Sequence, residues 1–166
     1  MKCLLFGGAE SVGKSKAIYR LAKRLITPPA TGATSPFSTF KDVHGSVPAS
    51  FADFHAVLEG KNNKGEDIRI IINSPTDTKA IINKFKKFYD SNGTYDILIS
   101  SVKEDSYPVR SYFFKTMSIS PSKNFILEIP LAKVRRGVIR AVSLNWYEKN
   151  LDGLVEHVLN RDPYNL

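Results

Sequence analysis

A glycine-containing octapeptide, Gly8–Ser15, is the feature that most constrains what this chain can fold into. Residues 2–6, just before it, form a short apolar run that predicts a buried parallel strand. After it, apolar side chains recur at the spacing of one helix face: Ala17, Ile18, Leu21, Ala22, Leu25 and Ile26. A buried strand, a glycine turn and an amphipathic helix in this order predict an α/β fold.

The spacing within the octapeptide suits the binding of phosphate groups. Glycines let the backbone turn tightly, and without a Cβ they let N–H groups approach phosphate oxygens. The turn leads into a helix N-terminus, where unpaired N–H groups and the helix dipole favour an anion. Every fixed position fits G-x-x-x-x-G-K-[ST], so the stretch resembles the Walker A motif, or P-loop, of the P-loop NTPase superfamily.

This resemblance implies a nucleotide site in which two side chains have defined roles. Lys14 would place its charge on the β- and γ-phosphates and act in catalysis, and Ser15 would offer its hydroxyl to Mg²⁺. The residues expected to contact the nucleotide are Gly8, Ala9, Glu10, Ser11, Val12, Gly13, Lys14, Ser15 and Lys16.

Length and composition indicate one globular domain over residues 1–166, large enough to bury a core. We find no apolar run of 18 residues, so no membrane span or membrane partner is expected. The single cysteine, Cys3, cannot form an internal disulfide, and the apolar start is too short for a signal peptide. We therefore expect a cytoplasmic protein, and its oligomeric state stays open.

The net charge of +8 leaves a nucleic-acid partner open. The basic residues are spread out, and many are expected on solvated helix faces, such as Lys16, Arg20, Lys23 and Arg24 of the first helix. The one tight cluster begins at Lys133 and includes Arg135 and Arg136. It follows a predicted core strand, so these two arginines are candidates for stabilising phosphate charge during catalysis.

Residues 28–51 are rich in Pro, Gly, Ser and Thr and predict a long loop that is either mobile or functional. Next, residues 54–58 and 67–73 predict a hairpin around the turn residues 62–65. A hairpin at this place in the chain is similar to the arrangement in the Ras-like branch of the superfamily. There the returning strand ends in the Walker B Asp-x-x-Gly.

The chain departs from that pattern at the end of its own returning strand. Asn73 stands where the Asp is expected, and Thr76 where the Gly is expected. Asn73 can still accept a hydrogen bond from metal-bound water, and Asp77 is a second candidate to reach Mg²⁺ together with Ser15. Asp77 can equally be the N-cap of the following helix, whose apolar face begins near residue 81. Both roles stay open.

Two further strands are predicted, over residues 96–101 and 124–130. Ligands of open α/β sheets bind beyond the carboxyl ends of the strands. The residues best placed at that edge after the first of these strands are Ser100, Ser101, Lys103, Glu104 and Asp105. The guanine-reading motif Asn-Lys-x-Asp does not occur anywhere in the chain, so ATP is the expected nucleotide.

Together these patterns predict a three-layer α/β domain similar to P-loop NTPases. The sheet is expected to be five-stranded and mostly parallel, with one antiparallel hairpin strand and helices on both faces. The expected function is a Mg²⁺-dependent ATP-binding NTPase whose hydrolysis drives a conformational or partner-binding cycle. A small-molecule or nucleotide kinase is the alternative, and a non-hydrolysing nucleotide-binding module, on nucleic acid or alone, is a further one.

Overall fold

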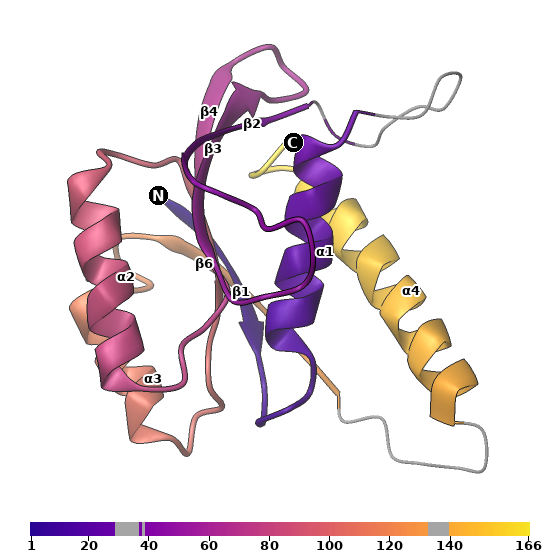
Figure 1. Ribbon diagram of the computed structural model, residues 1–166. Coiled ribbons are helices and arrows are strands. Elements are labelled where there is room, and N and C mark those ends of the chain that lie inside the picture. Colours follow the sequence, from indigo (N-terminus) through magenta and orange to yellow (C-terminus); the bar gives the residue numbers. More distant parts are fainter. Residues whose placement is uncertain (29–36, 38, 133–139) are drawn as a thin grey trace.

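The computed structural model describes residues 1–28, 37, 39–132 and 140–166. These residues form an α/β structure in which a mixed sheet carries helices on both faces (Figure 1). In chain order the elements are β1 (Lys2–Gly7), α1 (Lys14–Ile26), β2 (Lys41–Gly45), β3 (His55–Lys61), β4 (Asp67–Asn73), α2 (Lys79–Ser91), β5 (Ile97–Ser101), α3 (Pro108–Thr116), β6 (Phe125–Pro130) and α4 (Arg140–Leu159).

The strand order is β2-β3-β4-β5-β1-β6. The pairings β4–β5, β5–β1 and β1–β6 are parallel, and β3 pairs antiparallel with both β2 and β4. Because β5 lies between β1 and β4, the carboxyl ends of these three neighbouring strands meet at one edge of the sheet. That edge is the lower one in Figure 1, where the chain leaves β1 and turns back into α1.

The predicted five-stranded sheet is wrong by one strand, because β2 lies inside the stretch 28–51 that we expected to be a loop. All five residues of β2 are exposed, so the strand has no alternation of apolar and polar side chains that could reveal it. It forms by backbone pairing with the edge of β3, and the buried side chains of Phe40 and Val47 fix its two ends.

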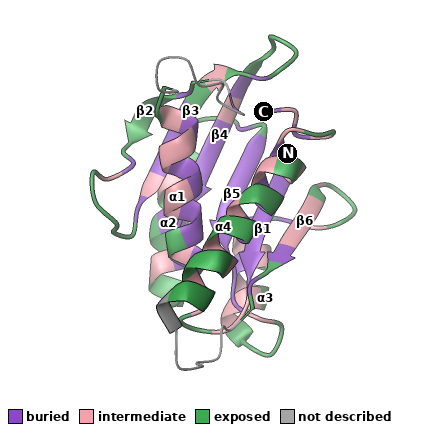
Figure 2. Cartoon of the chain, turned by 90° about the vertical axis from the view of Figure 1, so that its right-hand side faces the viewer, coloured by how far each residue is buried: buried purple, intermediate pink, exposed green. Residues whose placement is uncertain are grey.

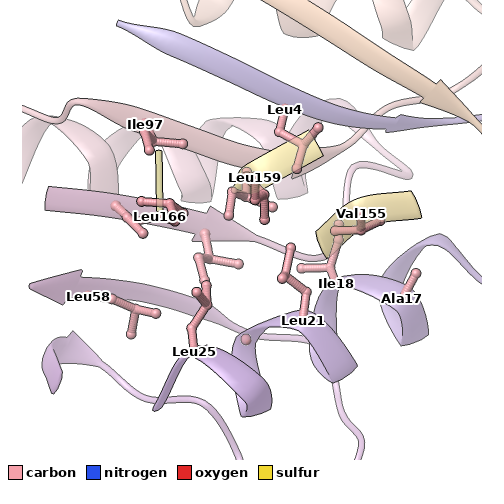
Figure 3. Packing of buried hydrophobic residues seen from close by; sticks show 14 of the residues in the cluster. Leu4, Ala17, Ile18, Leu21, Leu25, Leu58, Ile97, Val155, Leu159 and Leu166 are labelled. Carbon is pink, nitrogen blue, oxygen red and sulfur yellow. The ribbon is translucent and has the colours of Figure 1, made fainter. Parts of the chain in front are cut away.

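The alternation of side chains along the strands divides the core into two layers. On β1, Leu4 and Phe6 belong to the cluster under α1 and α4, whereas Cys3 and Leu5 belong to the cluster under α2 and α3. The predicted apolar face of α1 is confirmed, because its residues from Ala17 to Leu25 fill the first cluster (Figure 3).

The C-terminal helix α4 packs on the domain through a narrow apolar stripe. Leu151, Val155 and Leu159 are buried at intervals of one helical turn. Leu154 is 49% exposed, because α4 packs on the domain along one side only and its outward side is largely exposed (Figure 2). None of the helices that the structure describes is long and apolar enough to cross a membrane.

Candidate functional site

The loop between β1 and α1 has the backbone conformation that its glycines predict. Gly8, Ser11 and Gly13 all have positive φ angles, of 135°, 59° and 90°. Gly13 is the N-cap of α1, and none of the described side chains accepts a hydrogen bond there or places an acidic group in the first turn. The first N–H groups of α1 therefore point from an uncapped helix end toward the loop, which is the arrangement that binds anions.

Lys14 folds back over this loop and is only 9% exposed. Its Nζ donates to the carbonyl oxygens of Gly8, at 2.7 Å, and of Ala9, at 2.5 Å. Burial lowers the pKa of Lys14 from its ordinary value, and the positive charge of Lys103 lowers it further. Both hydrogen bonds of the lysine thus go to backbone carbonyls, and the carboxylates of Asp77, Glu104 and Glu10 act on its charge without a direct hydrogen bond.

Ser15 ties the start of α1 to the end of β4. Its Oγ donates to the carbonyl oxygen of Ser74 at 3.1 Å. The preceding residue, Asn73, is fully buried, and its Nδ2 donates to Ser100 Oγ at 3.0 Å. Asn73 Oδ1 has no hydrogen-bond partner among the described residues. The carboxyl ends of β1, β4 and β5 thus bring the glycine loop of residues 8–13, Ser15 and Asn73 together.

Asp77 is not the N-cap of α2, so that prediction is wrong. Thr78 is the N-cap, and its side chain accepts a hydrogen bond from the N–H of Ile81. Asp77 lies one residue too early to reach that N–H and instead forms an ion pair with Lys103, with 2.6 Å between Oδ1 and Nζ. Lys103, which follows β5, is almost completely buried, whereas the side chain of Asp77 is 53% exposed.

The other residues of the octapeptide contribute mainly their backbone groups to the candidate site. Glu10 and Ser11 are exposed, and Val12 packs against the core cluster under α1. Lys16, the last of the expected contacts, directs its side chain to Glu148 of α4 at 2.9 Å. Its ammonium is therefore paired with a carboxylate, and only its backbone is placed to serve the loop.

The basic face of α1 is not the freely solvated face that we expected. Arg20 pairs with Glu148 and with Asp152, at 2.9 Å from the latter, and Arg24 pairs with Glu156. These acidic residues all lie on α4, so the charges of α1 serve helix–helix packing. Because these cations are paired, this side of the molecule offers less unpaired positive charge to a nucleic acid.

The candidate arginines Arg135 and Arg136 lie outside the described residues. Arg110 on α3 is described, and its guanidinium pairs with Glu128 and Asp105, each at 2.6 Å. It also donates to the carbonyl oxygen of Lys103 at 2.9 Å. Arg110 therefore holds the segment after β5, and its own charge is paired with two carboxylates.

The structure adds polar groups next to Ser74 that the sequence did not point to. Ser74 Oγ accepts from the N–H of Phe54 at 2.8 Å and approaches Asp53 Oδ1 at 3.3 Å. A cavity of about 440 Å³ opens beside them, lined by Ser46, Asp53, Phe54, His55, Pro75, Ile81 and Lys84. No periodicity could have revealed it, because it forms between segments that meet only in the folded sheet.

The donor set at this edge fits a divalent cation that is also held by phosphate. Mg²⁺ is bound by oxygen ligands, and it commonly uses one or two protein groups together with phosphates and waters. The Ser15 hydroxyl and the Asp77 carboxylate are oxygen donors of this kind. Asn73 Oδ1 is a third, although Asn73 is fully buried and its side chain interacts with His55, which lies opposite it on β3. Among the described residues, no group of three or more His, Cys, Asp or Glu side chains gathers as a metal site of its own.

Comparisons with protein-family models, with curated proteins and with solved structures found no match to this chain. Its function therefore has to be inferred from the residues and the geometry of the site.

Proposed function

We propose that this chain is a Mg²⁺-dependent ATP-binding P-loop NTPase whose hydrolysis is coupled to a conformational or partner-binding cycle. The observation that carries the proposal is the position of Lys14. Its ammonium is nearly buried at the N-terminus of α1, and both of its hydrogen bonds go to carbonyls of its own loop.

Lysine is rarely buried unless an anion accompanies it. Carbonyl oxygens carry partial charges, whereas phosphate oxygens carry full ones, and charge-assisted hydrogen bonds are roughly twice as strong as neutral ones. A phosphate in the loop would therefore exchange two weak partners of Lys14 for a strong one. The uncapped N–H groups of α1 would add to this attraction.

The remaining groups have roles that agree with phosphoryl transfer. Ser15, with Asn73 or Asp77, would hold the metal, and the metal would neutralise charge on the phosphates. Lys14 would stabilise the charge that moves to the leaving oxygens, and Arg135 and Arg136 are proposed to do the same from the segment after β6. Most of the catalysis would come from positioning and charge stabilisation.

A second candidate function, a small-molecule or nucleotide kinase, is favoured by the cavity beside Ser74. Its lining includes three residues with titratable side chains, Asp53, His55 and Lys84. Since Ser74 also binds Ser15, this space adjoins the expected metal position. A hydroxyl acceptor bound there would give its proton to Asp53 and attack the γ-phosphorus of ATP, and the bond from that phosphorus to the bridging oxygen of ADP would break.

The test is thermal unfolding with ATP, ADP, GTP or CTP, each with Mg²⁺ and with EDTA. Ligand at 100 times its Kd stabilises the folded state by about 2.7 kcal/mol, which for a chain of this size is a shift of about 5–11 °C. We expect ATP with Mg²⁺ to shift the wild type and Lys16→Ala, and not Lys14→Ala. Lys16→Ala is the matched control, because the Lys16 ammonium is paired with Glu148 of α4 and not with the loop.

The absence of any shift with the wild type at millimolar nucleotide would refute the proposal. Where binding is seen, phosphate release distinguishes the alternatives. Release by the protein alone, or with added DNA or RNA, supports an ATPase, whereas transfer to an added acceptor supports the kinase. Binding without either supports a non-hydrolysing module.

A further inference from the structure

Two lysines, not one, are removed from water at the carboxyl ends of β1 and β5. Lys14 is 9% exposed and Lys103 is 5% exposed. Their charges oppose each other, because the positive charge of Lys103 is among the causes that lower the pKa of Lys14. Two buried like charges at one end of a sheet need an anion. Among the described residues, Lys103 forms an ion pair with Asp77, whereas Lys14 donates to backbone carbonyls and feels the carboxylates of Asp77, Glu104 and Glu10 only from farther away.

The backbone on both sides of the Asp77–Lys103 ion pair is held firmly. The Oγ1 of Thr76 and the Oγ of Ser101 are 2.9 Å apart, which joins the ends of β4 and β5. Val102 donates to the carbonyl oxygen of Phe6 at 2.9 Å, and this bond keeps the segment after β5 next to β1. The two side chains therefore face each other across fixed strand ends, and rotation of the side chains is enough to break their ion pair without movement of the backbone.

The two residues of the ion pair differ in their exposure to solvent, and this difference favours an exchange of partners. Lys103 is covered on one side by the ring of Tyr107, whose centroid lies 5.8 Å from Nζ, so its ammonium has little access to water. The carboxylate of Asp77 is half exposed and can be solvated or bound elsewhere. Asp77 can regain solvation when it is released, whereas Lys103 cannot, so the exchange is favourable only when another anion takes the place of Asp77.

We propose that Lys103 is a second phosphate-binding cation that Asp77 neutralises when no nucleotide is bound. On binding, the ammonium of Lys103 would pass from Asp77 to the polyphosphate, and Asp77 would become free to hold Mg²⁺. This inference rests on the proposed nucleotide site and adds a preference: with two cations, the site favours a triphosphate over a diphosphate.

The experiment is isothermal titration of ATP, ADP and inorganic triphosphate, with Mg²⁺ and with EDTA. The proteins are the wild type, Lys103→Met, Asp77→Asn and the control Lys123→Met, which removes an exposed lysine at the opposite edge of the sheet. Methionine keeps the apolar stem of Lys103, and Asp77→Asn changes an exposed side chain, so this second variant is expected to fold even where the first does not.

The proposal predicts effects of opposite sign. In EDTA, Lys103→Met should bind ATP about tenfold more weakly, the scale of one hydrogen bond to a charged group, and should lose the preference for ATP over ADP. Asp77→Asn should bind ATP more tightly in EDTA, because Lys103 is no longer neutralised, and should gain less from Mg²⁺. Lys123→Met should match the wild type.

Two results would overturn this inference while leaving the proposed function intact. One is that Lys103→Met binds ATP as tightly as the wild type does. The other is a weakening of metal-free binding in Asp77→Asn, which would mean that the ion pair only shapes the site. If the wild type binds no nucleotide at all, the proposed function fails, and this inference fails with it.

Discussion

Replacement of Ser74 by alanine tests how the end of β4 is held next to the start of α1. Ser74 is fully buried, and its Oγ accepts the hydrogen bond of the Phe54 N–H at 2.8 Å. Phe54 is itself 7% exposed, so water has little access to the N–H that loses its partner. Leaving a buried donor unsatisfied costs about 1–3 kcal/mol. The contact with Asp53 at 3.3 Å is part-buried and long, and we expect it to add little.

For a chain of this length, 1 kcal/mol corresponds to a change in Tm of about 2–4 °C, so Ser74→Ala should lower Tm by about 2–12 °C. The free energy of unfolding, measured by denaturant titration, gives the same quantity directly. Ser91→Ala is the matched control, because Ser91 Oγ donates to the Lys87 carbonyl at the exposed end of α2. Its effect should stay within about 0.5 kcal/mol.

Equal stability of the two serine variants would refute this reasoning, since it would mean that the Phe54 N–H does not depend on Ser74. The ligand response should behave differently from the stability. Ser15 binds the backbone oxygen of Ser74, which alanine retains. The shift in Tm caused by ATP and Mg²⁺ should therefore persist in Ser74→Ala, even though its starting Tm is lower.

Three further predictions follow from burial. Burial lowers the pKa of His55 below its ordinary value of 6.5. The unfolded chain therefore takes up this proton at a higher pH than the folded protein does, and the free energy of unfolding should fall as the pH drops below about 6.5. His55→Gln should weaken this pH dependence of unfolding, and the control His157→Gln, which changes an exposed residue, should not. Burial raises the pKa of Cys3 to about 11, so a thiol reagent at pH 8 should label it only after unfolding, and rapid labelling of the folded protein would contradict its position in the core. Gly7→Ala would place a Cβ against the carboxylate of Glu128 and should destabilise by about 1–3 kcal/mol in denaturant titration, whereas an unchanged stability would show that Glu128 moves without cost.

The sequence by itself determined the local units of this protein. The glycine spacing of the octapeptide and the apolar face of α1 predicted a strand, a turn and a helix, and all three are present. The turn residues 62–65 predicted the hairpin of β3 and β4 in the same way. Such features depend on residues a few positions apart, so period and turn chemistry are enough to predict them.

Only the tertiary structure decided which of these units became neighbours. β2 has no buried face of its own and exists because the edge of β3 offers it backbone partners. The pairing of the α1 cations with the carboxylates of α4 likewise joins segments more than 100 residues apart. At the site, the position of β5 between β1 and β4 brings Lys103 against Asp77 and near Lys14. Long-range strand order is set by packing of the whole sheet, and no spacing within one segment contains it.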